Sequence, residues 1–580
     1  MKKRSYLILY LLFIPVLLFA EWSSNPAQNF AVCDLAGSQA VPKIATSLNG
    51  DTYISWFSNE FGNYDVRLQR FDVYGNELWA HNGIIISNHP SMTWLTDWDM
   101  TVDETNHSVL TFQDIRNGGN NNIYAYRISP EGDFVWGADG LELSNTGAFD
   151  VSPKVTVTNA GNAVIAWQSD EVIIMQKISP EGNLLWGANG ITISCADTYS
   201  WPQLLPVGLD DVVMKFFKDS GVPWAPTRHV YAQRFDANGT AVWSEDTIIS
   251  IAGGISAWTQ IFPFINDGND GFFIAWHDDR DFNMLASVFI QHVDSEGITL
   301  YSDNGLEVSL MPNRNHFYPH LAFPTHSYDV YVYWNEMDGN QVQRGIYGQK
   351  ISATGERLWS NNGMAFIELS STNVYPIASR SSSSNSVVFY EEYLTTLNTQ
   401  VKAMCIDADG NFVWEVEQVI LSSVSSEKLH PDVNNFDNDQ WIAVWEDRRF
   451  DNGDIFAQNI QITGELGPVS VGADDPESYN SESFALFGNY PNPFKLTTTI
   501  KFTTGNTEKN NVILIYNMKG QLVKKFKIQS PIELGTKFKI NEVEWDGKAE
   551  NGKSVQTGVY FSILEINNRI VDCHKLILLR

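Results

Sequence analysis

Three copies of one short pattern place a carboxylate beside a guanidinium. An aromatic residue is followed by Asp two positions later and by Arg four positions later. Residues two apart in a strand share a face, and a neighbouring Asp and Arg form strong bidentate hydrogen bonds. Such pairs could grip a sugar acid or another polar ligand, or they could fasten a loop to its own strand. The pairs are Asp114 with Arg116, Asp278 with Arg280, and Asp447 with Arg449.

A second set of candidate ligand-binding residues is aromatic or basic and lies in irregular stretches between predicted strands. Aromatic faces beside polar side chains suit stacking on sugar rings, with hydrogen bonds to the hydroxyl groups. The alternative is packing, because the aromatic–proline pairs at 201–202, 262–263, 318–319 and 375–376 could instead seal neighbouring sheets. The candidates are Trp94, Trp98, Trp201, Trp224, Arg228, Trp258 and His316.

Metal and catalytic chemistry are weakly represented in the sequence. Two Asp/Asn/Gly clusters, at 267–270 and 447–454, could hold Ca²⁺ through carboxylate and carbonyl oxygens, although neither matches a helix–loop–helix calcium site. Otherwise no cofactor is predicted. The four cysteines have no metal-ligand spacing and are expected to be buried free thiols. The sequence contains no nucleophile elbow, zinc-binding helix motif or phosphate-binding glycine loop, so no catalytic residue is predicted.

The elements that must position these candidates are repeated strands. A strand, a turn ending in Gly and a closing aromatic residue recur with glycine spacings of 50 to 58 residues. In seven repeats Asp or Ser stands three positions before the Gly, where it can cap the turn. Such a repeat, made only of strand and turn signals, is typical of a propeller blade. The turn glycines are Gly75, Gly132, Gly182, Gly239, Gly297, Gly355, Gly410 and Gly464.

Each repeat predicts four strands, and the last repeat runs out before its fourth. The N-terminal segment from Trp22 to Pro42 resembles the missing piece, so it is expected to complete the last blade and remove an exposed edge. The predicted fold is therefore all-β, with an eight-bladed β-propeller over residues 21–464. Seven blades are the alternative, because the second repeat is the least regular. Large aromatic rings at fixed repeat positions are expected to fill the space between neighbouring sheets.

The two ends of the chain carry different signals. Residues 1–20 form a basic segment followed by a short apolar run, the pattern of a cleaved secretory signal peptide. No later stretch is apolar enough for a transmembrane anchor in the mature chain. The formal net charge is −30. That charge disfavours nucleic acid as a partner, because it repels phosphate.

After a turn-rich linker at 465–483, the composition becomes basic and a second pattern of short strands begins at residue 484. Residues 484–580 contain 14 Lys and Arg against 8 Asp and Glu. The strands and their Gly, Asp and Asn turns predict a small immunoglobulin-like β-sandwich. The specific residues in this region are Tyr490, Pro491, Asn492, Pro493 and Phe494, then Trp545, Asp546 and Gly547, then Gly558 and Tyr560.

The order of these residues resembles the type A C-terminal sorting domain of the type IX secretion system. That resemblance covers about a sixth of the chain. It implies the secretion machinery as a partner, and a location outside the cell or on the outer surface of a Gram-negative bacterium. It says nothing about the function of the propeller.

Taken together, the sequence favours a secreted or surface-attached propeller that binds a polysaccharide, a glycan or a surface partner. One alternative is a glycoside hydrolase or lyase that uses carboxylates on the loop-bearing face of the propeller. Another is a structural or adhesion component of the cell surface without a small-molecule site.

Overall fold

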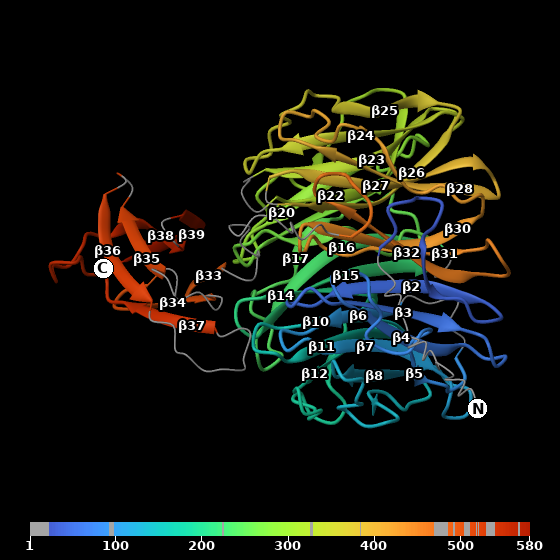
Figure 1. Ribbon diagram of the computed structural model, residues 1–580, viewed down its shortest axis with the longest axis horizontal. Coiled ribbons are helices and arrows are strands. Elements are labelled where there is room, and N and C mark those ends of the chain that lie inside the picture. Colours follow the sequence, from blue (N-terminus) through green and yellow to red (C-terminus); the bar gives the residue numbers. More distant parts are fainter. Residues whose placement is uncertain are drawn as a thin grey trace, which may run out of the picture. The chain divides into compact units, whose positions relative to one another are not determined.

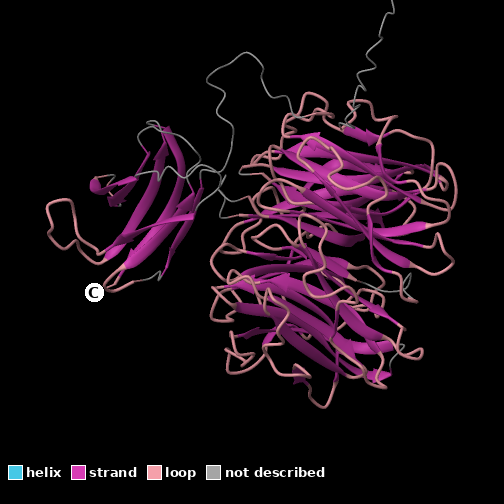
Figure 2. Cartoon of the chain, turned by 60° about the horizontal axis from the view of Figure 1, so that its bottom comes forward, coloured by secondary structure: helices cyan, strands magenta, loops and turns pink. Residues whose placement is uncertain are grey.

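The computed structural model describes two compact units, Met1–Val469 and Ser470–Arg580. The described residues are strands, turns and loops, without a helix (Figure 2). Among them, no helix has the length and apolar character needed to cross a membrane. The described residues are 22–91, 98–222, 225–324, 329–382, 384–468, 485–490, 494–503, 511–517, 519, 521–528, 540–566 and 569–579.

The first unit consists of four-stranded antiparallel sheets, numbered here along the chain (Figure 1). Sheet 1 contains β2 (Gln39–Thr46), β3 (Thr52–Ser58), β4 (Asp65–Phe71) and β5 (Ile84–Ser87). Sheet 2 contains β6 (Asp99–Val102), β7 (Ser108–Asp114), β8 (Asn122–Ile128) and β9 (Leu141–Glu142). Sheet 3 contains β10 (Asp150–Val157), β11 (Ala163–Ser169), β12 (Val172–Ile178) and β13 (Ile191–Ile193). Sheet 4 contains β14 (Thr198–Val207), β15 (Asp211–Val222), β16 (Ala225–Phe235) and β17 (Thr247–Ser250).

The second half of this unit repeats the plan. Sheet 5 contains β18 (Phe264–Asn266), β19 (Phe272–Asp278), β20 (Ser287–Val293) and β21 (Leu306–Glu307). Sheet 6 contains β22 (Arg314–Ala322), β23 (Val330–Asp338), β24 (Arg344–Ile351) and β25 (Met364–Ser370). Sheet 7 contains β26 (Asn373–Ser381), β27 (Ser386–Thr395), β28 (Asn398–Ile406) and β29 (Val419–Ser422). Sheet 8 contains β30 (Lys428–Val433), β31 (Gln440–Asp447), β32 (Asp454–Gln461) and the N-terminal strand β1 (Phe30–Cys33).

The two ends of the first unit meet in sheet 8. β1 pairs antiparallel with β32, with Phe30 opposite Ala457 and Ala31 opposite Phe456. β2 of sheet 1 in turn contacts β30 and β31 of sheet 8. Accordingly, the blue strand β2 and the orange strands β30 to β32 are neighbours in Figure 1. The N-terminal segment therefore forms the fourth strand of the last sheet.

The turn between the third and fourth strands is capped as the sequence predicts. In the first repeat the Gly75 amide donates to the Asp72 carbonyl at 3.1 Å. The Asp72 carboxylate accepts hydrogen bonds from the amides of Tyr74 and Asn76 at 2.9 and 2.8 Å. Ser129 Oγ caps the corresponding turn of the second repeat. Asp or Ser at this position thus satisfies amides that the turn leaves without a partner.

An aromatic ring from one repeat lies against the turn glycine of the next repeat, along the whole first unit. A side-chain carbon on Gly297, where φ is +81°, would lie 2.5 Å from the Trp243 ring. The indole Nε1 of Trp243 also donates to the Ser295 carbonyl at 3.1 Å. These ring–glycine contacts join Trp22 to Gly75, Trp79 to Gly132, Trp136 to Gly182, Trp186 to Gly239, Trp243 to Gly297, Tyr301 to Gly355, Trp359 to Gly410 and Trp414 to Gly464.

A second set of rings fills the space between sheets, as predicted. These tryptophans end the second strands and are at most 1% exposed. The ring at Trp276 shares its core with residues of sheet 4, including Phe217 and Val230. The set comprises Trp56, Trp167, Trp276, Trp334 and Trp445.

The first strands carry a recurring bulge at the residue that precedes proline. The register of β22 shifts between Phe317 and His320, and Tyr318 adopts a left-handed φ of +52°. A bulge bends its strand and redirects the side chains around it. The same conformation occurs at Val41, Ser152, Trp201 and His430.

The three cysteines whose side chains are described, Cys33, Cys195 and Cys405, are free thiols, and the expectation that all are buried is wrong. Cys33 and Cys405 are buried, and burial raises the pKa of each to about 12. Cys195 is exposed, contrary to the prediction, because it follows the short outer strand β13. No disulfide joins it to Cys33, which belongs to a different sheet.

The second unit contains two sheets that share one core. The core includes Phe494, Ile500, Ile513, Trp545 and Leu578. One sheet has the order β33 (Ala485–Tyr490), β34 (Thr498–Thr503), β37 (Ile540–Trp545). The other has the order β36 (Leu522–Ile528), β35 (Asn511–Asn517), β38 (Gly558–Ile566), β39 (Arg569–Leu578).

The motif residues of this unit are built into its packing. Trp545 is fully buried, and its Nε1 donates to the Lys548 carbonyl at 2.9 Å across the turn that contains Asp546 and Gly547. Tyr560 packs on Trp545 and donates its hydroxyl hydrogen to the Gln556 carbonyl at 2.6 Å. Tyr490 ends β33 and Gly558 begins β38. Pro491, Asn492, Pro493, the predicted signal peptide at 1–20 and most of the linker at 465–483 lie outside the described residues.

We expect Gly297→Ala to destabilise the first unit by about 2–4 kcal/mol. The new methyl group would both strain a left-handed residue and collide with the Trp243 ring. Gly62→Ala is the matched control, because Gly62 has a φ of +89° but no atom within 4 Å of the added carbon. It should cost only about 1 kcal/mol. Urea denaturation of the full chain would measure the free energy of unfolding of both variants. If Gly297→Ala and Gly62→Ala lowered it equally, the collision with the ring would add nothing to the backbone strain.

Candidate ligand-binding cleft

A cleft of about 780 Å³ is formed by sheets 5, 6 and 7 and by the connection that leads from sheet 4 to sheet 5. Its volume lies within the range of small-molecule sites in proteins. Aromatic side chains dominate its wall, and it has no Asp or Glu in its lining. The lining comprises Ser256 and residues 258–265, 276–277, 317–321 and 379–380.

Trp258, a predicted candidate, is the most exposed aromatic residue of this wall. It lies on the connection between sheets 4 and 5, and its side chain is 89% exposed. Arg228, also a predicted candidate, fixes the backbone of this connection by donating hydrogen bonds to the carbonyls of Ala257 and Thr259 at 3.3 and 2.9 Å. Asp219 in turn fixes Arg228 through two hydrogen bonds of 2.8 and 2.7 Å. Arg228 is therefore a positioning residue, and Trp258 presents a free ring face.

His316 supports the part of the wall that sheet 6 contributes. It is 1% exposed, and its Nε2 lies 3.2 Å from the Glu336 carboxylate. Glu336 also accepts a hydrogen bond from Trp334 Nε1 at 2.8 Å. This arrangement anchors the start of β22, and the bulge that follows places Phe317 and Tyr318 in the lining. Tyr318 is 52% exposed, so it is a second exposed aromatic residue of the lining, beside Trp258.

Three basic side chains, which the sequence reasoning missed, complete the cleft. His277 and His320 line it, and burial lowers the pKa of each to about 4. His277 packs edge-on against Phe317 and Tyr318. The charge of Arg380 further lowers the pKa of His320, and burial lowers the pKa of Arg380 itself. The sequence signal for His277 was its position directly after the repeated Trp276, at the end of a second strand.

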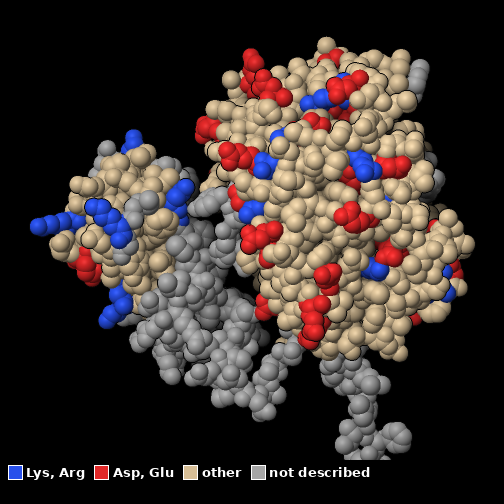
Figure 3. All heavy atoms as spheres, turned by 90° about the horizontal axis from the view of Figure 1, so that it is seen from above, with Lys and Arg blue, Asp and Glu red and all other residues tan. Residues whose placement is uncertain are grey.

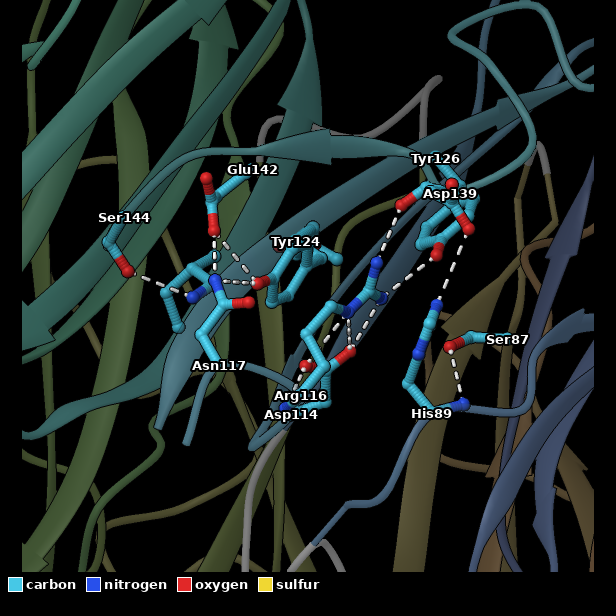
Figure 4. A network of polar contacts seen from close by, with 12 residues as sticks. Ser87, His89, Asp114, Arg116, Asn117, Tyr124, Tyr126, Asp139, Glu142 and Ser144 are labelled. Carbon is cyan, nitrogen blue, oxygen red and sulfur yellow. Dashed lines mark hydrogen bonds and ion pairs between the residues drawn. The ribbon is translucent and has the colours of Figure 1, made fainter. Parts of the chain in front are cut away.

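The predicted Asp–Arg pairs lie outside this cleft, each within its own sheet. In sheet 2 the Arg116 guanidinium donates to Asp114, with the shortest contact at 2.6 Å, and lies 3.6 Å from the centre of the Tyr124 ring (Figure 4). It also donates to the Tyr126 hydroxyl at 3.0 Å and to the Asp139 carbonyl at 2.8 Å. Arg116 thus fastens the end of the second strand to the third strand and to the segment before the fourth.

The other two pairs repeat this arrangement with different partners. Arg280 donates to Asp278 and to the Asn304 carbonyl, and lies over the Phe289 ring. Arg449 donates to Asp447 and to Asn29 before β1, and lies over the Phe456 ring. The three carboxylates are at most 2% exposed. These hydrogen bonds stay within one sheet or join it to a neighbouring loop, which is the arrangement that the loop-fastening hypothesis expects.

Of the four remaining predicted residues, two lie within the described part of the chain and neither is in the lining of the cleft. Trp98 is 1% exposed within the core between sheets 1 and 2, where its Nε1 donates to the Val41 carbonyl. Trp201 is partly buried, and its carbonyl accepts a hydrogen bond from Lys215, which also reaches the Gln260 carbonyl. Trp94 and Trp224 lie outside the described residues.

The acidic clusters considered for Ca²⁺ are engaged in their own turns. Asp267 accepts hydrogen bonds from the amides of Asn269 and Gly271 and contacts His292 at 2.9 Å. Asp451 accepts from the Gly453 amide. Within the described ranges, no group of three or more His, Cys, Asp or Glu side chains has an arrangement that could hold a metal ion.

The C-terminal unit can be assigned from its sequence. Residues 489–578 match the family described as the secretion system C-terminal sorting domain. The C-terminal unit is a sorting domain of this family. The match begins just before the Tyr490 to Phe494 segment and includes Gly558 at the start of β38 and two core residues of the unit, Trp545 and Tyr560. A sorting domain of this kind implies export through the type IX secretion machinery.

Among curated proteins, none matches the sequence significantly. The solved structures it resembles include an α-L-arabinanase from Penicillium chrysogenum in complex with arabinobiose, with 11% identity, 54% of this chain and 94% of that chain covered, and a TM-score of 0.32. The polysaccharide lyase Uly1 shows 9% identity, coverage of 77% and 92%, and a TM-score of 0.37. Prolyl oligopeptidase B from Galerina marginata is 10% identical, the match covers 73% of this chain and 56% of that chain, and the TM-score is 0.39. Likenesses this distant carry no argument about function.

The two cleft histidines should make the first unit less stable in acid. Their pKa is about 4 in the folded protein and near 6.5 in the unfolded chain, so the unfolded chain binds more protons between these values. Their contribution is therefore fully present above pH 6.5 and is lost as the pH falls to 4. We expect the double variant His277→Gln, His320→Gln to lose roughly 3–5 kcal/mol less stability than the natural chain between pH 7 and pH 4.5. If urea denaturation showed the same loss of unfolding free energy in the natural chain and in the double variant, the two histidines would not be the cause of the acid sensitivity.

Proposed function

We propose that this protein is an exported β-propeller that binds carbohydrate chains in the cleft of sheets 5 to 7. The observation that supports this most directly is that Trp258 and Tyr318, two exposed aromatic residues from different parts of the chain, line the same cleft of about 780 Å³. Aromatic rings stack on the apolar faces of sugars, while polar groups between them bind hydroxyls. Gln260, Thr259 and the neutral histidines supply such polar groups.

The proposed architecture is an eight-bladed propeller over residues 21–464, closed by the N-terminal strand. The pairing of β1 with β32 and the contacts of β2 with β30 and β31 favour it. The ring–glycine contacts favour it too, because the ring that meets Gly75 of sheet 1 is Trp22, directly before the strand that completes sheet 8. A linker at 465–483 and an immunoglobulin-like sandwich at 484–580 complete the proposed domain order.

The proposed location is outside the cell or on the outer surface of a Gram-negative bacterium. A signal peptide at 1–20 would direct the chain across the inner membrane, and the sorting domain would direct it through the type IX machinery. The surface charge is compatible with separate roles for the units. Acidic side chains are scattered over the visible face of the first unit, whereas Lys and Arg stand out on the sorting domain (Figure 3).

The chemistry of the cleft favours binding over hydrolysis. Glycoside hydrolysis commonly requires two carboxyl groups that flank the scissile bond, and the lining of this cleft contains neither Asp nor Glu. The hydrolase hypothesis therefore has no support at this site. A surface component without a small-molecule site remains the competing proposal, and glycan binding discriminates between the two.

We expect the full chain to bind at least one glycan class in a broad array, and Trp258→Ala to weaken that binding by about fivefold, because stacking on an exposed ring is worth about 1 kcal/mol. Phe61→Ala is the matched control. Phe61 is also exposed, at 66%, but belongs to the loop after β3 in sheet 1. Isothermal titration should show unchanged affinity for this control.

Two results would count against carbohydrate recognition in the cleft. Absence of binding across the array would favour the surface-component proposal. An equal loss of glycan affinity in Trp258→Ala and Phe61→Ala would place the binding surface outside the cleft. Release of reducing ends from a bound glycan would instead revive the enzyme hypothesis.

Removal of the sorting domain should stop export at the outer membrane. A chain that ends at residue 483 keeps the proposed signal peptide and propeller, so we expect it to accumulate in the periplasm. Phe61→Ala in the full chain controls for sequence change without loss of the domain. Cell fractionation would measure the distribution, and appearance of the truncated chain in the medium at the natural level would contradict the assigned role.

A further inference from the structure

We propose that the cleft selects acidic sugars, with the carboxylate of a uronic acid residue bound by Arg380. This inference rests on the proposed carbohydrate function and specifies its ligand. Three observations carry it: the kinds of ionisable group in the lining, the hydrogen bonds of Arg380, and the neutral donors that lie beside it.

Apart from the phenol of Tyr318, the ionisable groups of the lining are all of basic type. They are Arg380, His277 and His320. This is unusual for the chain in which they occur, because Asp and Glu outnumber Lys and Arg by 68 to 38. An anionic ligand group would therefore meet no carboxylate in the wall, and it would meet a permanent positive charge at Arg380.

Arg380 is held in place by backbone carbonyls. Its Nε donates to the carbonyls of Val433 and Asn434 at 3.1 Å each, and its Nη1 donates to the Ser379 carbonyl at 3.1 Å. Its Nη2 donates to the Val433 carbonyl. Each terminal nitrogen carries a second N–H, for which no acceptor lies among the described residues. The side chain is thus rigid, and its outer fork remains available to a ligand.

The charge of Arg380 is not neutralised by an ion pair with any described carboxylate. Asp432 of β30 acts on it electrostatically, but the hydrogen bonds of Asp432 go to the amides of Ile44 and Val433. A partly buried cation without an ion-pair partner is costly, and a ligand carboxylate would supply the missing charge. A planar guanidinium and a planar carboxylate can form two parallel hydrogen bonds.

The histidines allow such a ligand to bind over a wide pH range. Both lie in the lining with Arg380, and because the pKa of each is about 4 they are neutral at ordinary pH. A neutral imidazole donates one hydrogen bond and accepts another, which suits sugar hydroxyl groups. We therefore expect the preference for acidic sugars to come from Arg380 and to stay constant between pH 8 and pH 5.5.

The test compares acidic oligosaccharides with neutral counterparts of the same sugar. The probes are trisaccharides of galacturonate, glucuronate and mannuronate, each beside its carboxyl-reduced form, titrated into the full chain by calorimetry. Short probes limit the long-range repulsion from the acidic protein surface. At least one acid should bind at least tenfold more tightly than its reduced form.

Two variants connect the preference to the residue. Arg380→Gln should bring the acid and its reduced form to equal affinity, whereas Trp258→Ala should weaken both and leave their ratio unchanged. Arg357→Gln is the matched control, because Arg357 also donates to a backbone carbonyl, that of Glu307, but lies outside the cleft lining. Because loss of Arg380 could impair folding, the comparison of ligands on the natural chain stands by itself.

The outcomes separate this inference from the function on which it rests. Equal, Trp258-dependent binding of acidic and reduced sugars, or binding of neutral glycans alone, would overturn acid selection and leave carbohydrate binding intact. Binding of no glycan at all would overturn both. A preference for the acid that persists in Arg380→Gln would assign the charge recognition to another residue.

Discussion

The contact between an aromatic ring and a turn glycine is the interaction on which the rest of the first unit depends. Each sheet has a hairpin that reaches the ring of the preceding repeat, and at Gly75, Gly297 and Gly464 only glycine leaves room for that ring. In most repeats the indole N–H also donates to a carbonyl of the same turn, as Trp79 does at Pro130 and Trp414 does at Ile462, whereas Trp22 Nε1 has no partner among the described residues. Apolar burial and a directional hydrogen bond therefore set the spacing of neighbouring sheets together.

The cleft is a local departure from this regular scaffold. The bulge before proline occurs in five sheets, so it is part of the scaffold, but at Tyr318 it places a half-exposed ring in the cleft. The Asp219–Arg228 pair likewise resembles the loop fasteners of other sheets, yet its outer hydrogen bonds go to the carbonyls on either side of Trp258. Structural features that recur in several sheets therefore position Trp258 and Tyr318, which do not recur.

Much of the fold could be predicted because its signals are local. A capped turn with Gly, a period of two and a repeated ring each depend on a few neighbouring residues, and the fourth strand at the N-terminus followed from counting strands. The cleft was harder to predict. Trp258 and the segment around His316 stood out as irregular, but Arg380 is more than a hundred residues away along the chain from Trp258, and it joins the cleft only through the packing of sheets 5 to 7. The expectation for Trp98 was wrong. Its irregular sequence context predicted a ligand-binding residue, but its side chain is buried in the core.

Sheet 8 has a consequence for the order of events during folding. Phe30 pairs with Ala457, so this sheet cannot form until nearly the whole first unit has been synthesised and its ends have met. Closing a loop of this length carries a large entropic cost and is slow compared with the formation of a hairpin. The earlier sheets can form from local contacts alone, but the last must wait for the most distant pairing in the unit.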